Sequence, residues 1–286
     1  MTRIVFVNGN FVPYDEAKIP IMDRGFLFAD GIYEVSAVVN GSLVDNEAHL
    51  ARLDRSLKEI RIANPYSQEE WVRLEQELVR RNGLVEGLVY MQVTRGVAER
   101  DFAFPKNAPP TVVMFTQAKV ITNSQAAETG VAVVSVPDLR WKRRDIKSVA
   151  LLAQVLAKQA AAEAGVYEAW MVEDGLVTEG SSSTAFIITA DRRVVTRPLS
   201  HAILPGITRL AVMRLAQEAG LTLDERPFTL EEAFAASEAF LTSASSFVMP
   251  VVTIDGKPVG DGKPGPLTRR LRALYLEMAG VPKAAA

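Results

Sequence analysis

Apolar residues near the start of the chain fall into short runs separated by turn residues. The run at residues 4–7 is followed by Asn8-Gly9, a dipeptide that tolerates the positive φ angles of a tight turn, and then by further apolar residues. A second run at residues 33–39 is followed in the same way by Asn40-Gly41. The pattern therefore predicts two antiparallel hairpins.

The spacing of apolar residues then changes to that of helices. From Leu50 to Ile60 they recur at intervals of three or four, which predicts an amphipathic helix over residues 46–61. Ser67 and Glu70 have the spacing of a capping box and predict a second helix that ends at Asn82-Gly83. Two strands are expected after it, over residues 87–94 and 111–116.

A polar stretch without periodicity, residues 118–130, separates the two halves of the chain. We expect an N-terminal α/β domain over residues 1–117, a linker over 118–130 and a C-terminal domain over 131–286. Because the strands cluster in hairpins instead of alternating strictly with helices, the fold class is α+β. The elements expected in the second half are strands over 131–136, 185–189 and 238–242, hairpins at 174–175 and 255–256, helices over 148–164, 208–219 and 267–279, and a short helix capped by Thr229 and Glu232.

The composition narrows the possible functions. The 286 residues, 48% of them apolar, are enough for two domains with a core each. A net charge of −2 offers no general attraction to nucleic acid or to an anionic membrane. With no cysteine and only two histidines, the chain cannot form disulfides or thiolate metal sites and is poorly supplied for a histidine metal centre. The N-terminus lacks a signal-peptide pattern and no apolar run approaches the ~20 residues of a membrane span, so a cytoplasmic location is expected.

Four polar loops in the second half carry the candidate chemistry. Lys147, in the first, is either a solvated surface residue or a nucleophile whose pKa is lowered by burial or by cationic neighbours such as Arg143 and Arg144. The second loop, residues 177–184, is either a flexible turn or a support that lets Glu179 hold a protonated heterocycle.

The other two loops are candidate anion sites. Residues 204–209 lead into a helix whose first N–H groups attract an anion, although Thr208 can equally be a simple N-cap. The small-residue turn at 242–246 can offer backbone N–H groups to a phosphate or a carboxylate. A lysine nucleophile, a carboxylate and two anion sites are together what a pyridoxal phosphate site requires.

Several motifs, taken together, resemble those of the class IV aminotransferases. This family includes D-amino acid aminotransferases, branched-chain aminotransferases and aminodeoxychorismate lyases, and the D-amino acid branch is the most similar of these. The resemblance extends over almost the whole chain, from Val5 to Leu271. It implies the two-domain fold type IV architecture, pyridoxal 5′-phosphate as the cofactor, and a homodimer. The motifs are DRGFLFADGIYEV, EAHLARLDRSL, RWKRRDIKS, VTEGSSST, ILPGITR, LTS and IDGKPVGDGKPG.

The resemblance also implies a role for each matching residue, with the cofactor bound by the C-terminal domain. Lys147 corresponds to the lysine that forms a Schiff base with the cofactor and then moves the proton at the substrate α-carbon. Glu179 corresponds to the acid that pairs with the pyridine nitrogen. The other cofactor-binding positions are Arg52, Leu204, Ile207, Thr208, Ser243 and Ala244. The substrate-binding positions are Tyr33, Arg100 and Phe102, of which Tyr33 and Arg100 match residues that bind the substrate carboxylate.

Three positions depart from the family pattern. Phe102 replaces the histidine of the Arg-x-His found in the D-amino acid branch, which removes a polar group from the carboxylate-binding set. Ala244 replaces a phosphate-binding threonine, so that only its backbone N–H can contribute. Thr184 replaces an asparagine after the serine run.

We therefore expect an aminotransferase that moves an amino group between a D-amino acid, or an (R)-amine, and a 2-keto acid. A branched-chain aminotransferase or an aminodeoxychorismate lyase of the same fold would share the cofactor residues. A binding protein that had lost catalysis would have no reason to keep Lys147 and Glu179. No metal, nucleic acid or membrane partner is expected.

Overall fold

The computed structural model describes residues 2–281, which fold into two compact units. The first unit contains the residues up to Val120 together with Ile146–Ala150. The second unit contains Ile121–Asp145 and the residues from Leu151 onward. Each unit has its own sheet with helices, which confirms the α+β class.

The first unit is built on a six-stranded antiparallel sheet. Its strands are β1 (Ile4–Val7), β2 (Asn10–Pro13), β3 (Gly31–Val39), β4 (Ser42–Leu43), β5 (Gly87–Thr94) and β6 (Thr111–Ala118). Their order in the sheet is β2-β1-β6-β5-β3-β4. Both predicted hairpins, β1–β2 and β3–β4, are present. In the first turn Asn8 and Gly9 have φ angles of 46° and 91°, as this tight turn requires.

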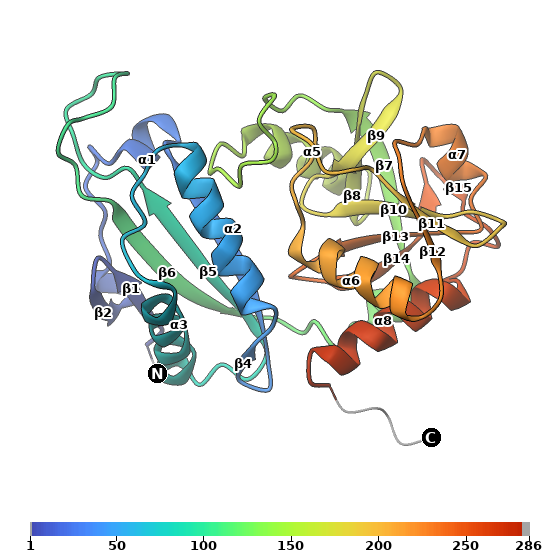
Figure 1. Cartoon of the computed structure of the whole chain (residues 1–286), viewed down its shortest axis with the longest axis horizontal. Helices are drawn as coiled ribbons and strands as arrows, with labels where there is room; N and C mark the ends of the chain where they lie inside the picture. The colour runs from blue at the N-terminus through green and yellow to red at the C-terminus, as the bar shows by residue number, and fades with distance from the viewer. Residues whose placement is uncertain (1, 282–286) are drawn as a thin grey trace. The chain divides into compact units, whose positions relative to one another are not determined.

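Two amphipathic helices, α2 (Asn46–Glu59) and α3 (Gln68–Asn82), lie across this sheet (Figure 1). The leucines that predicted the first of them, Leu50, Leu53 and Leu57, are buried in the core of the unit. Periodicity therefore identified the face of α2 that packs on the sheet.

Shorter elements complete the first unit. Ser67 caps α3 by accepting a hydrogen bond from the Glu70 N–H, but the Glu70 carboxylate binds Arg73 instead of closing the predicted capping box. The sequence did not predict the 3-10 turn η1 (Tyr14–Glu16) or the helix α1 (Arg24–Phe28), because each is too short to show helical periodicity.

The second unit is built on a nine-stranded mixed sheet. Its strands are β7 (Val131–Pro137), β8 (Glu168–Glu173), β9 (Leu176–Gly180), β10 (Thr184–Ile188), β11 (Arg193–Thr196), β12 (Thr222–Glu225), β13 (Glu238–Ser243), β14 (Phe247–Ile254) and β15 (Lys257–Pro258). Their order is β12-β11-β10-β13-β14-β7-β8-β9, with β15 paired to β14. β7 runs parallel to β8 and β14, and β11 runs parallel to β12.

Helices accompany this second sheet (Figure 1). They are α4 (Gln125–Thr129), α5 (Leu152–Glu163), α6 (Ile207–Glu218), α7 (Leu230–Phe234) and α8 (Pro266–Met278). The capping box predicted before α7 is complete, since Thr229 and Glu232 each bind the other's backbone N–H.

Two predictions near the domain boundary need correction. The expected linker at residues 118–130 contains α4, whose Ala127 is buried in the core of the second unit. The helix expected from residue 148 begins at Leu152 instead. Its expected first turn is extended because the backbone of residues 146–150 forms hydrogen bonds with β3.

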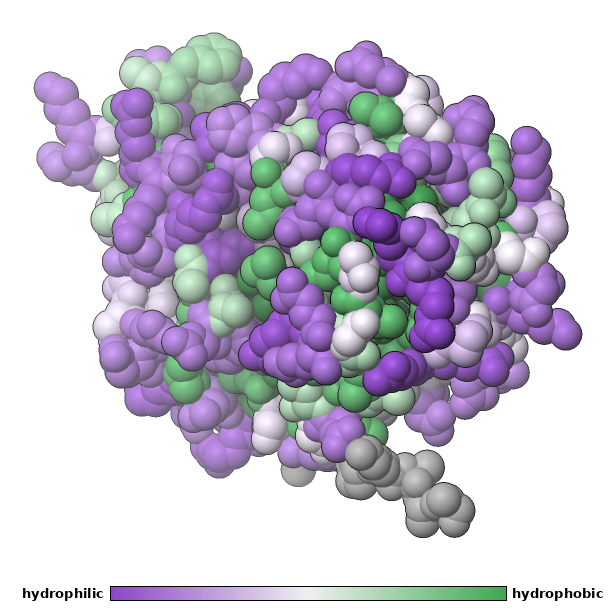
Figure 2. Space-filling view, turned by 45° about the vertical axis from the view of Figure 1, so that its right-hand side comes forward, coloured by the Kyte–Doolittle hydropathy of each residue, from purple (hydrophilic) through white to green (hydrophobic). Residues whose placement is uncertain are grey.

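The surface is mostly polar. Figure 2 shows a face on which hydrophilic side chains predominate and hydrophobic ones form smaller groups between them. Among residues 2–281, no helix has the length and apolar character needed to cross a membrane. In the first unit, large apolar side chains are exposed on α1 and on the connection between β5 and β6: Phe26, Val97, Phe102 and Phe104.

Candidate active site

Lys147 lies on the extended segment of the first unit, beside β3 and α2. Its carbonyl accepts a hydrogen bond from the Tyr33 N–H at 2.9 Å, and its own N–H donates to the Ser56 Oγ at 3.4 Å. The Lys147 Nζ lies 4.2 Å from the centre of the Tyr33 ring. The structure therefore brings together the predicted lysine nucleophile and one predicted substrate residue.

The two arginines that precede Lys147 are occupied by carboxylates. Arg143 binds Asp145, with 3.0 Å between Nε and Oδ1. Arg144 binds Glu173 through two hydrogen bonds of 2.8 Å. Neither arginine is thus the uncompensated cation that the sequence suggested.

Arg52 projects from α2 into a buried cluster and is not the exposed arginine that its position alone would suggest. Its Nε and Nη2 donate to the two oxygens of Glu34, at 2.7 and 2.8 Å. The Nδ1 of His49 lies 2.8 Å from the same carboxylate. Burial acts to raise the pKa of Glu34, but the charge and hydrogen bonds of Arg52, together with His49, hold it far below the usual range. Glu34 is therefore a charged group that fixes the orientation of Arg52.

His49 is the neutral member of this cluster. Burial lowers the pKa of its ring, and the charges of Arg52 and Lys147 act in the same direction, while Glu34 opposes them. A neutral ring beside a carboxylate carries its proton on the facing nitrogen, so His49 donates from Nδ1 to Glu34.

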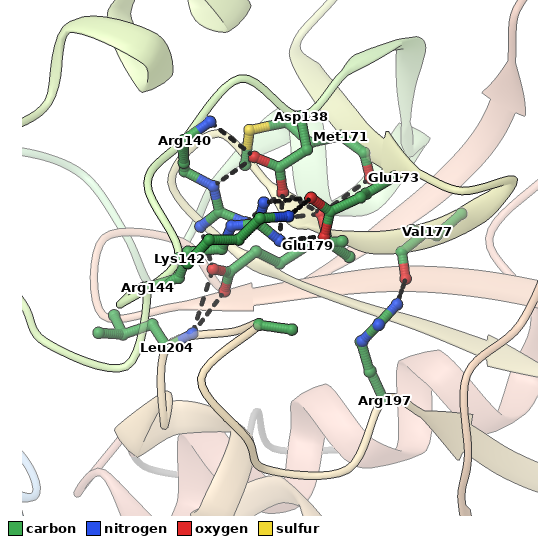
Figure 3. A network of polar contacts seen from close by, with 12 residues as sticks. Asp138, Arg140, Lys142, Arg144, Met171, Glu173, Val177, Glu179, Arg197 and Leu204 are labelled. Carbon is green, nitrogen blue, oxygen red and sulfur yellow. Dashed lines mark hydrogen bonds and ion pairs between the residues drawn. The ribbon is translucent and has the colours of Figure 1, made fainter.

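In the second unit, Glu179 on β9 is the centre of a polar network (Figure 3). The Arg140 Nη1 donates a short hydrogen bond to Glu179, and the Leu204 N–H lies 3.1 and 3.3 Å from its two oxygens. Burial raises the pKa of Glu179, whereas the charge and hydrogen bond of Arg140 and the Leu204 N–H act against that rise. Arg140 thus supplies the counter-charge that a buried carboxylate needs.

A second carboxylate holds Arg140 in place. Asp138 accepts hydrogen bonds from the Arg140 Nε at 3.0 Å and Nη2 at 2.7 Å. The Thr178 hydroxyl, next to Glu179 on β9, also donates to Asp138 at 2.6 Å. The sequence identified Glu179 but not Asp138 or Arg140, although Arg140 is the first residue of the RWKRRDIKS motif.

The predicted serine loop is also held by a carboxylate and is not a flexible turn. Glu168, buried on β8, accepts hydrogen bonds from the hydroxyls of three consecutive serines, Ser181, Ser182 and Ser183. The loop that follows Glu179 is therefore ordered by its own polar contacts.

The start of α6 is an uncapped helix N-terminus. Gly206 occupies the N-cap position and no side chain caps the helix, so the alternative reading of Thr208 as the N-cap is wrong. A Cβ atom on Gly206 would lie only 2.8 Å from the Thr184 Oγ1. The first-turn N–H groups of Ile207 and Thr208 are suited to an anion.

The turn after β13 is built from small residues, as expected. The Ser243 Oγ lies 2.7 Å from the Ser246 Oγ and 3.2 Å from the Ser245 Oγ. These contacts fix the position of Ser243, and Ala244 follows it in the turn.

The remaining predicted substrate residues form a separate group. Phe102 is 78% exposed, and its ring centre lies 5.4 Å from that of Phe28. The Arg100 Cζ lies 5.3 Å from the same Phe28 ring. Within residues 2–281, no hydrogen bond or ring contact joins Tyr33 to Arg100 or Phe102.

A further buried carboxyl group, Glu75 on α3, lies near Glu34. It is 0% exposed, and its Oε2 accepts a hydrogen bond from the Asn46 Nδ2 at 2.8 Å. Its other oxygen has no hydrogen-bonding partner in the part of the chain that the structure describes. Burial, together with the negative charge of Glu34, raises the pKa of Glu75 to about 8. This carboxyl group is therefore protonated at neutral pH.

Both the sequence and the fold are similar to those of known aminotransferases. Residues 31–254 match the family described as Amino-transferase class IV. The chain is 42% identical over 269 residues to the D-alanine aminotransferase of Staphylococcus aureus (strain MSSA476), covering 94% of this chain and 95% of that protein. It is 40% identical to the D-alanine aminotransferase of Bacillus licheniformis, covering 94% of each chain. The fold matches the crystal structure of the branched-chain aminotransferase from Thermoproteus uzoniensis with norvaline, with a TM-score of 0.89, 26% identity, and 99% of this chain and 97% of that chain covered.

Replacing Glu75 by glutamine should make the protein more stable at alkaline pH. The folded state keeps the Glu75 proton up to about pH 8, whereas an unfolded glutamate loses it near its ordinary value of 4.5. The folded state binds more protons between these values, so this group lowers stability as pH rises through that window. The variant should gain about 2–4 kcal/mol at pH 8 and little at pH 4.5.

Urea unfolding of Glu75→Gln and of the unchanged protein at both pH values checks this prediction. Glu47→Gln, an exposed change on α2, is the matched control and should shift neither curve. Equal destabilisation by Glu75→Gln at both pH values would contradict it.

Proposed function

This chain belongs to the class IV aminotransferases, and from that membership we propose that it moves an amino group between a D-amino acid and a 2-keto acid, with pyridoxal 5′-phosphate as its cofactor. The similarity to D-alanine aminotransferases over 94% of the chain supports the D-amino acid as donor. The observation that carries the reaction class is the buried Glu179 carboxylate, which Arg140 and the Leu204 N–H hold in one position. Such a carboxylate suits a protonated pyridine ring.

The donor groups of the chain fit this cofactor. Its phosphate suits the uncapped start of α6, where Gly206 has no room for a side chain. Its aldehyde suits the amine of Lys147, and its ring nitrogen suits Glu179. When bound, the cofactor supplies a carbon that accepts the amino group and a ring that withdraws electrons from the substrate α-carbon.

Three residues carry the proton chemistry. Lys147 holds the cofactor through its Nζ and, once free of it, moves the proton at the substrate α-carbon. Glu179 holds a proton on the ring nitrogen, and Arg140 opposes the rise that burial causes in the Glu179 pKa, which favours the charged state that this requires.

The remaining residues position the cofactor. Arg52, held by Glu34, binds the phosphate with a charge-assisted hydrogen bond. The phosphate also accepts hydrogen bonds from backbone N–H groups at the start of α6 and in the turn after β13. Leu204 packs against the cofactor ring. The residues of those turns are Ile207, Thr208, Ser243 and Ala244.

The substrate carboxylate is bound by Tyr33 and Arg100. Phe102, whose ring centre lies 5.6 Å from the Arg100 Cζ, adds apolar surface next to Arg100, which favours an (R)-amine as a second class of donor. We also propose that the enzyme is a homodimer and acts in the cytoplasm, as the family resemblance and the sequence imply.

A branched-chain aminotransferase is the second candidate function. The structural match to the Thermoproteus uzoniensis enzyme favours it, but at 26% identity that match is more distant than the one to the D-alanine aminotransferases. An aminodeoxychorismate lyase would differ from both by releasing pyruvate without any amino acceptor.

Absorption spectra of the holoenzyme separate these candidates. D-Alanine should convert the bound cofactor from the pyridoxal to the pyridoxamine form, and pyruvate should reverse the change. L-Leucine should have no such effect, and conversion by L-leucine alone would favour a branched-chain aminotransferase. Lys147→Ala is the control and should show no conversion with any donor.

Glu179→Gln should slow the reaction without releasing the cofactor. A neutral amide cannot keep the ring nitrogen protonated, and this interaction matters most as charge develops at the α-carbon. The kcat should fall about 100-fold while KM changes little. Glu173→Gln, which removes a charge that binds Arg144 in the same network, is the matched control and should keep most of the activity. An unchanged kcat in fully loaded Glu179→Gln would falsify the role of Glu179.

Phe102→His should shift preference toward D-amino acids. The imidazole adds a donor for the substrate carboxylate, which needs charge-assisted hydrogen bonds once it leaves water. One such bond is worth about 1.5–3 kcal/mol, or roughly 10- to 150-fold in kcat/KM. The ratio of kcat/KM for D-alanine to that for (R)-1-phenylethylamine should rise accordingly. No change in this ratio would mean that position 102 does not contact the carboxylate.

A further inference from the structure

We propose that Arg24 is a positioning residue for substrate selection, because it fixes the backbone of the loop that carries Arg100 and Phe102. This inference rests on the proposed function, in which Arg100 binds the substrate carboxylate and Phe102 supplies the apolar surface next to Arg100. The loop follows β5. Its aromatic side chains are exposed, but its backbone is hydrogen-bonded to the buried side chain of Arg24. Figure 1 shows α1, which begins with Arg24, beside this long connection between β5 and β6.

Arg24 is a buried cation whose hydrogen bonds reach the loop. It is only 3% exposed, and its Nε donates to the Asp30 Oδ2 at 2.8 Å. Its Nη1 donates to the Asp101 carbonyl at 2.5 Å, and its Nη2 to the Phe102 carbonyl at 3.4 Å. A buried guanidinium needs acceptors for its N–H groups, so these two carbonyls are held where the side chain points.

A second buried arginine holds the same carboxylate. The Arg95 Nε and Nη2 donate to the two oxygens of Asp30, at 2.7 and 3.0 Å. Arg95 also donates to the carbonyl of Ile60 at 2.6 Å, and its Cζ lies 3.6 Å from the centre of the Phe104 ring. Asp30 therefore joins two arginines, each in contact with the loop.

Phe28 connects Arg24 to the predicted substrate residues by a second route. The Arg24 Cζ lies 4.7 Å from the centre of the Phe28 ring, and the Arg100 Cζ lies 5.3 Å from it. The Phe102 ring also packs on Phe28. Within residues 2–281 Arg100 forms no ion pair, so these ring contacts place its side chain while its charge stays available for a carboxylate.

The backbone of α1 is joined to the start of the loop as well. The Arg24 N–H donates to the Gly96 carbonyl at 2.9 Å, and the Ala98 N–H donates to the Met22 carbonyl at 3.3 Å. The guanidinium of Arg24 extends this attachment to Asp101, near the exposed end of the loop. Loss of that side chain should therefore free the residues around position 101 and leave those around position 97 in place.

The test is Arg24→Gln, which leaves the Asp30–Arg95 pair intact. Cleavage by trypsin after Arg100 in the native enzyme should become at least tenfold faster than in the unchanged enzyme, because an exposed loop that is released from Arg24 opens more readily to a protease. The KM for D-alanine and for pyruvate should each rise about tenfold, because both carry a carboxylate, while kcat stays within about twofold. Simple destabilisation would instead lower the amount of active enzyme and leave KM unchanged.

Two further variants keep the test decisive. Arg73→Gln removes an exposed arginine that binds Glu70 on α3 and should change neither cleavage after Arg100 nor KM. Since loss of a buried arginine can prevent folding, Phe28→Leu provides a second test and should raise the same two KM values without altering the ion pairs. Unchanged cleavage after Arg100 in Arg24→Gln, or unchanged KM in either variant, would overturn the inference. If the unchanged enzyme is inactive on every D-amino acid, the proposed function is refuted instead, and the rate of cleavage still decides whether Arg24 anchors the loop.

Discussion

The need to compensate buried carboxyl groups is the constraint on which the rest of this structure depends. A carboxylate removed from water requires a counter-charge, several hydrogen bonds or a proton. Arginines compensate Glu34 and Glu179, three serine hydroxyls compensate Glu168, and the first N–H groups of α8 compensate Glu238. Glu75 has neutral hydrogen-bonding partners such as the Asn46 amide in place of an arginine, so it keeps its proton. Each of these interactions holds the carboxyl group and its hydrogen-bonding partner in one position.

This constraint explains why the candidate site is already ordered by the chain itself. The guanidinium of Arg52 has its direction set by Glu34, and the carboxylate of Glu179 has its direction set by Arg140 and a backbone N–H. Asp138 in turn fixes Arg140. Groups held in this way do not reorganise as charge develops on a substrate, which is the condition under which electrostatic stabilisation is strongest.

The sequence predicts those parts of the fold that depend on local chemistry. The Asn8-Gly9 hairpin and the leucine face of α2 were found as expected, because turn preferences and periodicity act over a few residues. The hairpin expected at residues 255–256 is present as β14–β15, but the sequence did not predict that β14 extends back to Phe247 through Pro250, a residue that is uncommon inside a sheet. Residues 148–150 were predicted as the start of a helix because their extended state depends on pairing with β3, which is far away in the sequence.

The residues of the candidate site also differ in this respect: some can be predicted from local sequence, and others depend on partners that are distant in the sequence. Lys147 and Glu179 lie in motifs that could be read directly, and both remain predicted roles. Arg140 lies in one of those motifs, but its partner Glu179 is 39 positions away, and no spacing rule connects them.

The loop that follows β5 combines a buried arginine that holds its backbone, Arg24, with an exposed side chain at Phe102. Because the hydrogen bonds from the Arg24 guanidinium to the loop end on the backbone carbonyls at 101 and 102, the side chain at 102 can change without loss of these hydrogen bonds. Under the proposed function, selectivity for the carboxylate can therefore vary at this position while the fold stays the same.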